Sequence, residues 1–142
     1  ARILHMVRDP MDTCYAVFKT LFRKAYYYSY DLPELADYYT AYRRLMAHWH
    51  NLMPGAILDV HYEELVSNPL DVSKQIADFV GVEWTEQLVE LQDLDKAFST
   101  PSASQVREPI YTSSVGRWRH FETQLEPLRQ RLAAAGIVDD NS

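Results

Sequence analysis

The first twenty residues constrain the fold more than any other stretch of the chain. Residues 2–7 are largely apolar and indicate a buried strand. An Arg-Asp-Pro run at residues 8–10 follows directly, and a helical pattern continues from Met11 to about Lys24. A helix start offers backbone N–H groups and a partial positive charge, and arginine adds a charged fork that matches phosphate. A strand that leads an arginine into a helix therefore favours an anion-binding corner.

A second strand, at residues 56–61, sets the expected fold class. Both strands are largely apolar, which is typical of a parallel sheet covered on both faces. Helices join them, as the crossover of a parallel pair requires. Two strands alone do not make a stable covered sheet. We therefore predict the C-terminal part of a larger α/β domain, mostly helical; the alternative is a compact helical domain with a small two-stranded sheet.

Composition and charge exclude several classes of protein. The 142 residues make one domain at most, with the 47% hydrophobic and 24% charged composition of a globular protein. A net charge of −6 argues against non-specific nucleic-acid binding. No apolar run approaches the roughly 20 residues of a membrane span. Cys14 is the single cysteine, which excludes an internal disulfide and fits a reducing, cytoplasmic compartment.

The remaining elements follow from helical periodicity and from residues that begin or end helices. Leu32-Pro33 opens a long helix that runs to about Met53, before a Pro-Gly pair. Further helices are predicted at residues 63–66, 70–80, 85–94 and 122–135. Residues 98–115 have little periodicity and many Ser, Thr and Pro residues. A long loop of this kind is more often functional than idle.

Two candidate site residues follow the predicted strands, where parallel sheets bind their ligands. Arg8 fits a phosphate or sulfate ligand, and equally a structural clip with Asp9 or Asp12. Tyr62, which follows His61, fits stacking on a base or donation to a phosphate. A tyrosine that packs in the core is at least as compatible with the pattern.

Two late segments, residues 102–107 and 113–118, are rich in hydroxyl and cationic side chains that could hold anionic oxygens. Within them we favour a functional role for Arg117 and a core position for Trp118. Cys14 is interpreted as a small buried residue rather than a nucleophile. The tyrosines at 26–28 are interpreted as packing or a lid. The five histidines show no metal-ligand spacing, so no metal site is predicted.

Together these residues resemble the sulfotransferase superfamily. The run at residues 8–12 looks like the strand-loop-helix motif that binds the 3′-phosphate of 3′-phosphoadenylyl sulfate (PAPS). Residues 61–66, HYEELV, resemble the HYE-x-LV segment of the tyrosylprotein-sulfotransferase branch. Residues 102–106, Pro109 and residues 116–118 resemble the late donor-binding loop of that branch. Bacterial sulfotransferase domains often found behind helical repeats carry similar QVR-x-PIY-x-SSVGRW runs.

The resemblance implies a P-loop-like three-layer α/β/α sulfotransferase fold, of which residues 1–142 would be the C-terminal part. It implies sulfuryl transfer from PAPS, without a metal, to a hydroxyl or amine of a peptide, carbohydrate or small molecule. Arg8 would clamp the 3′-phosphate, Tyr62 would contact the nucleotide, and Arg117 would bind the donor's phosphate. The late loop would supply further donor contacts from Ser102, Gln105, Val106 and Tyr111. Ser102 would also stabilise the transition state.

The chain departs from the family pattern in two ways. The motif usually has a serine eight residues after its arginine, where this chain has Ala16, which should cost about 1 kcal/mol of donor binding. The Gly-rich 5′-phosphosulfate loop and the catalytic base are not found in these residues, so we expect little turnover from them alone. Two alternatives remain. One is a nucleotide kinase-like phosphotransferase, which needs a GxxxxGK[ST] loop. The other is a non-catalytic, degenerate sulfotransferase-fold module, which Ala16 favours.

Overall fold

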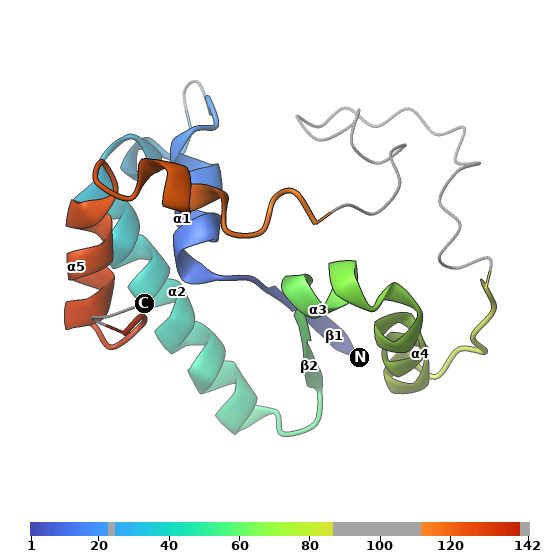
Figure 1. Ribbon diagram of the computed structural model, residues 1–142. Coiled ribbons are helices and arrows are strands. Elements are labelled where there is room, and N and C mark those ends of the chain that lie inside the picture. The colour runs from blue at the N-terminus through green and yellow to red at the C-terminus, as the bar shows by residue number, and fades with distance from the viewer. Residues whose placement is uncertain (23–24, 87–111, 140–142) are drawn as a thin grey trace. The chain divides into compact units, whose positions relative to one another are not determined.

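The computed structural model describes residues 1–22, 25–86 and 112–139 (Figure 1). It is mixed α/β and mostly helical, with one sheet of two parallel strands, and this confirms the predicted fold class. The chain divides into two compact units. The first comprises residues 1–7 and 56–113, and the second comprises residues 8–55 and 114–142. Each unit is described by itself.

The first unit is built on the parallel pair of β1 (Ile3–Val7) and β2 (Ile57–His61). The register pairs Ile3 with Ile57 at one end and Val7 with His61 at the other. In β2, Ile57 and Val60 are buried, because α3 (Tyr62–Ser67) and α4 (Pro69–Val80) pack against this strand. The sheet therefore has a covered strand, β2, on which the helices of this unit rest.

The strand β1 is less buried than its sequence predicts. Its apolar residues Ile3, Leu4 and Met6 are 40%, 41% and 50% exposed. Within the described residues β1 pairs with β2 alone, and a large part of its apolar surface stays exposed. The prediction of a strand is confirmed, and the prediction that it is buried is wrong. Burial depends on neighbouring elements, which the apolar pattern of one segment cannot reveal.

The ends of α4 follow ordinary helix chemistry. Pro69 stands in the first turn, where its missing N–H costs nothing, and Gly81 ends the helix in the left-handed conformation at φ 83°. The Gly81 N–H donates to the Ala77 carbonyl at 2.8 Å. Beyond the helix, Trp84 Nε1 donates to Ser73 Oγ at 2.8 Å and so ties the following segment back to α4. The helix predicted at 85–94 lies almost entirely outside the described residues.

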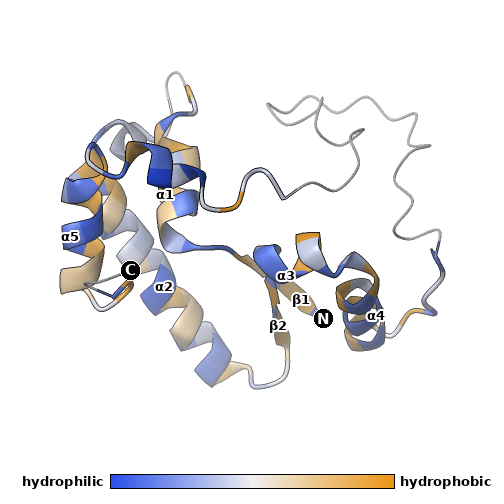
Figure 2. Cartoon of the chain, in the orientation of Figure 1, coloured by the Kyte–Doolittle hydropathy of each residue, from blue (hydrophilic) through white to orange (hydrophobic). Residues whose placement is uncertain are grey.

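The second unit is helical. It contains α1 (Pro10–Phe18), α2 (Leu32–Leu52), α5 (Glu126–Ala134) and two short 3₁₀-helices, η1 (Tyr27–Tyr30) and η5 (Arg117–Phe121). Hydrophilic and hydrophobic residues alternate along α2 and α5, as Figure 2 shows. The apolar faces meet in one core, because α2 packs against both α1 and α5, and α1 packs against η5. The buried members of this core are Met11, Cys14, Leu35, Ala36, Tyr39, Trp118, Leu125, Leu128 and Leu132.

Two helix boundaries differ from the prediction. The first helix ends at Phe18 rather than near Lys24, and the Thr20 N–H donates to the Val17 carbonyl at 3.1 Å instead of to Ala16, as it would in a continuing α-helix. The last helix begins at Glu126 rather than Glu122. Pro127 explains this boundary, since proline is tolerated in a first turn and breaks a helix interior.

The tyrosine tract also has a structural role. The ring of Tyr28 stacks on that of Tyr38 in α2, with 3.8 Å between the ring centroids. Burial and the neighbouring Tyr38 hydroxyl raise the pKa of Tyr28 to about 12. Tyr27 is 71% exposed, so only part of the tract is used for packing.

Candidate functional site

The two strands end at the same edge of the sheet. Val7 and His61 are paired in the parallel register, and Arg8 and Tyr62 are the residues that directly follow them. Both Arg8 and Tyr62 are partly buried. The sequence predicted this placement of the strand ends, and the register confirms it.

The turn between β1 and α1 is stabilised by its own acidic residue. Asp9 caps α1, because its Oδ1 atom accepts from the Asp12 N–H at 2.8 Å. Pro10 is the first helical residue, a position where its fixed φ fits and its missing N–H costs nothing. The local sequence therefore fixes the direction in which the chain leaves Arg8.

Arg8 and Asp12 both bind a segment about one hundred positions downstream. The Arg8 Nη2 atom donates to the Ser114 carbonyl at 2.5 Å. The Asp12 carboxylate accepts two backbone N–H groups, from Gly116 at 2.5 Å and from Trp118 at 3.2 Å. All five residues belong to the second unit. Residues 8–12 and residues 113–118, two runs that the sequence singles out separately, are thus hydrogen-bonded to each other.

Asp12 is a residue whose role the sequence analysis missed. It is 1% exposed, and such a buried carboxylate is stable only when its oxygens are hydrogen-bonded. The two N–H groups and the start of α1 provide this stabilisation. The sequence had suggested Asp12 as a possible partner of Arg8. Its spacing from Asp9 marks the first helical turn, but nothing local indicates residues 116 and 118.

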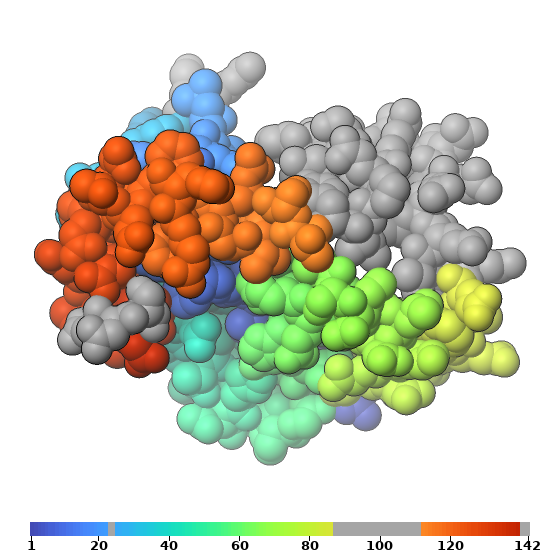
Figure 3. Space-filling model, in the orientation of Figure 1, coloured from blue at the N-terminus to red at the C-terminus, as the bar shows by residue number. Residues whose placement is uncertain are grey.

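The neighbouring residues 117 and 118 differ sharply in burial. Arg117, the first residue of η5, is exposed, and its segment lies on the surface shown in Figure 3. Trp118 is 3% exposed and belongs to the core, which confirms the predicted anchor. Gly116 precedes them with φ 72°, a left-handed conformation that favours glycine. The sharp turn at Gly116 thus brings a buried tryptophan and an exposed arginine into one short segment.

Cys14 is fully buried in the same unit. Burial first, and the charge of Asp9 second, raise the pKa of its thiol to about 12. The thiol therefore stays protonated near neutral pH, and only the thiolate is a strong nucleophile. This confirms the interpretation of Cys14 as a small core residue.

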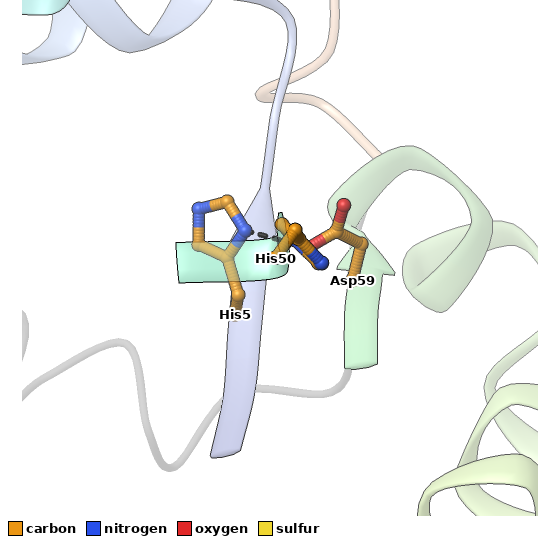
Figure 4. A group of neighbouring side chains, drawn as sticks. All are labelled: His5, His50 and Asp59. Carbon is orange, nitrogen blue, oxygen red and sulfur yellow. Dashed lines mark hydrogen bonds and ion pairs between the residues drawn. The ribbon is translucent and has the colours of Figure 1, made fainter. Parts of the chain in front are cut away.

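One further polar pair lies in the sheet itself. His5 and Asp59 occupy paired positions on β1 and β2, and His5 Nδ1 lies 2.7 Å from Asp59 Oδ1 (Figure 4). The pair links the two strands across the parallel register. Sequence reasoning did not identify it, because it depends on the register of two strands whose paired residues are 54 positions apart.

Several predicted site residues cannot be placed. Ser102, Gln105, Val106 and Tyr111 lie outside the described residues. Ala16, where the resemblance implies a serine, lies in α1, and its carbonyl accepts from the Thr20 hydroxyl. None of the helices in the described part of the chain is long and apolar enough to cross a membrane.

Comparison with known proteins relates this chain to sulfotransferases. A protein-family model described as "Sulfotransferase family" matches residues 1–86. An uncharacterized protein of Aquifex aeolicus is 29% identical over 135 residues, which cover 93% of this chain and 18% of that protein. Putative protein-tyrosine sulfotransferases of Caenorhabditis elegans and Caenorhabditis briggsae are 26% and 24% identical. Each match covers 83% of this chain, and 48% and 44% of those two proteins.

The chain spans less than half the length of each of these relatives. The family match includes Arg8 and Tyr62, the two residues that follow the strands. It favours the sulfotransferase interpretation over that of a nucleotide kinase. Because the family model matches 86 of the 142 residues, the chain belongs to the sulfotransferase family.

Proposed function

We propose that this chain contributes the nucleotide clamp of a sulfotransferase that transfers a sulfuryl group from PAPS to a hydroxyl or amine acceptor. The observation that carries the proposal is the hydrogen bonding between residues 8–12 and residues 114–118, each of which contains an arginine. Arg8 and Asp12 hold the backbone of residues 114–118, so Arg8 and Arg117 belong to one hydrogen-bonded corner. A corner with two arginines and a helix start suits the phosphates of a nucleotide.

The proposed roles follow the family resemblance. Arg8 binds the 3′-phosphate of the donor, Arg117 binds the donor's phosphate, and Tyr62 contacts the nucleotide. Further contacts to the donor come from the late loop, at Ser102, Gln105, Val106 and Tyr111. Ser102 also lies near the transferring sulfuryl group and stabilises the transition state.

In the proposed reaction these residues form no covalent bond with the donor. Sulfuryl transfer, like phosphoryl transfer, depends on positioning and on neutralising the charge that develops at the bridging oxygen. Arginine stays charged at every pH at which proteins are folded, so Arg8 and Arg117 bind and orient the donor without moving a proton. In this proposal the catalytic base and the 5′-phosphosulfate loop come from outside these 142 residues.

The proposal treats residues 1–142 as the C-terminal part of a single sulfotransferase domain. The greater length of the relatives supports it, and so does the apolar surface of β1. Ile3, Leu4 and Met6 are the kind of residues that a further strand or helix covers in a parallel sheet. The acceptor is proposed only by chemical class, as a hydroxyl or amine of a peptide, carbohydrate or small molecule.

Calorimetric titration with 3′-phosphoadenosine 5′-phosphate, the donor product, tests the proposal. Replacing Arg8 with alanine removes charge-assisted hydrogen bonds worth about 1.5–3 kcal/mol, so the affinity should fall roughly 10- to 150-fold. Arg8→Lys should recover only part of the loss, because lysine lacks the planar fork. Arg44→Ala is the matched control, since Arg44 is exposed on α2 and carries the same charge.

Each outcome discriminates between the interpretations. If Arg8→Ala binds the nucleotide as tightly as the wild type, the role assigned to Arg8 is wrong. If Arg8→Ala and Arg44→Ala weaken binding equally, the effect is one of overall charge and not of the corner. A wild-type protein that does not bind the nucleotide supports the non-catalytic module, the alternative that Ala16 favours.

A further inference from the structure

We propose that Asp12 is a positioning residue that aligns Arg117 with Arg8 in the nucleotide clamp. This inference rests on the proposed function and adds a residue to it. Asp12 is 1% exposed, and its carboxylate accepts hydrogen bonds from the backbone of Gly116 and Trp118, while its own N–H donates to the capping residue Asp9. A buried charge of this kind needs a reason to be present, since burial is costly unless both oxygens are satisfied.

The first argument is where its hydrogen bonds fall. Asp12 Oδ2 accepts from the N–H of Gly116 and Asp12 Oδ1 accepts from the N–H of Trp118. These two residues flank Arg117 on either side. The backbone of Arg117 is therefore held at both ends by one carboxylate, while its side chain stays exposed.

The second argument is how Asp12 is connected to Arg8. The Asp12 N–H donates to Asp9 Oδ1 at 2.8 Å, and Asp9 is the residue next to Arg8. A separate tie runs from Arg8 Nη2 to the Ser114 carbonyl, three residues before Arg117. The two arginines are thus joined by two independent routes, and Asp12 is the centre of one of them.

The third argument is the match between the side chain and its partners. Two backbone N–H groups require two acceptor oxygens, and a carboxylate supplies them. An asparagine has one oxygen, so its NH₂ group would face one of the two N–H donors. On the far side, the buried ring of Trp118 fixes the segment to the core. Together, the carboxylate and the tryptophan fix the backbone of Arg117, and therefore the point from which its exposed side chain extends, relative to α1.

A double-mutant cycle on the protein, with 3′-phosphoadenosine 5′-phosphate as the titrant, tests this inference. The variants are Asp12→Asn, Arg117→Ala and the combination of both. If Asp12 acts through Arg117, then Asp12→Asn should weaken binding on the order of tenfold in the wild-type background, the range of residues in one network. In the Arg117→Ala background the same substitution should change the affinity by less than about twofold.

Two further variants separate positioning from folding. Asp37→Asn makes the same chemical change at an exposed site in the same unit and should leave binding unchanged. Asp12→Glu keeps both oxygens and the charge but adds one methylene, so it should fold, bind more weakly than the wild type, and lose that defect in the Arg117→Ala background. This variant keeps the test available if Asp12→Asn does not fold.

The outcomes distinguish the inference from the function on which it rests. If the Asp12 variants weaken nucleotide affinity by the same factor with and without Arg117, Asp12 has a merely structural role and the inference is overturned. Unchanged binding by Asp12→Asn or Asp12→Glu also overturns it. A wild-type protein that binds no nucleotide overturns the proposed function itself, and the inference with it.

Discussion

Replacing Trp118 with alanine should destabilise the second unit strongly. Trp118 is 3% exposed and is packed in the core with Leu125, Leu128 and Leu132, which are all 2% exposed or less. Truncating a buried tryptophan removes its apolar contacts and leaves a cavity, at a cost of about 3–5 kcal/mol. Since domains are stable by only about 5–15 kcal/mol, this is a large share of the total. The ring also anchors η5, so its loss should release the Arg117 segment.

Urea denaturation followed by far-ultraviolet circular dichroism measures the effect. Trp49→Ala is the matched control, because it makes the same change at a tryptophan that is 39% exposed on α2. The control should lose much less free energy of unfolding, because only part of the Trp49 side chain is packed against other residues. Trp118→Phe retains most of the ring and should fall between the two, which keeps the measurement possible if the alanine variant does not fold. Equal losses at Trp118 and Trp49 would refute the assignment of Trp118 to the core.

Two further predictions concern titratable groups. Because burial raises the pKa of Cys14 to about 12, its thiol should not react with Ellman's reagent at pH 8 until urea unfolds the protein; rapid reaction of the native protein would contradict its burial. The hydrogen bond from Arg131 lowers the pKa of Asp37 below its usual 3.8, so the folded state holds this proton less tightly than the unfolded state. The pair's contribution should therefore be present above pH 3.8 and disappear as the pH falls through the lowered pKa. The difference in Tm between the wild type and Asp37→Asn should shrink over that range, and a constant difference would argue against the pair.

The local features of the fold were predictable from the sequence. Apolar runs located both strands, and proline and glycine located the ends of α2 and α4, because these residues act through backbone geometry at their own position. The misplaced start of α5 also has a local cause, in Pro127. This proline is visible in the sequence, but helical periodicity alone predicts a helix that begins before it.

The features that the sequence did not reveal are contacts between distant segments. The pairing of His5 with Asp59 depends on strand register, and the exposure of β1 depends on what else covers the sheet. The bonds from Asp12 to Gly116 and Trp118 join positions more than one hundred residues apart. A single sequence carries no periodic pattern over such a distance. The two motifs could be selected as candidates, but their contact could not be predicted.

The distance between Asp12 and its partners has a consequence for how the corner is made. A ribosome completes α1 long before it adds residues 114–118, at roughly 5–20 residues per second. Until then the Asp12 carboxylate has neither of its two downstream N–H donors. Closing so long a loop is entropically costly, and contacts of high sequence separation slow folding. The residues of α1 that form this corner are therefore synthesised early, but the corner is complete only when residues 114–118 have been added and pack against α1.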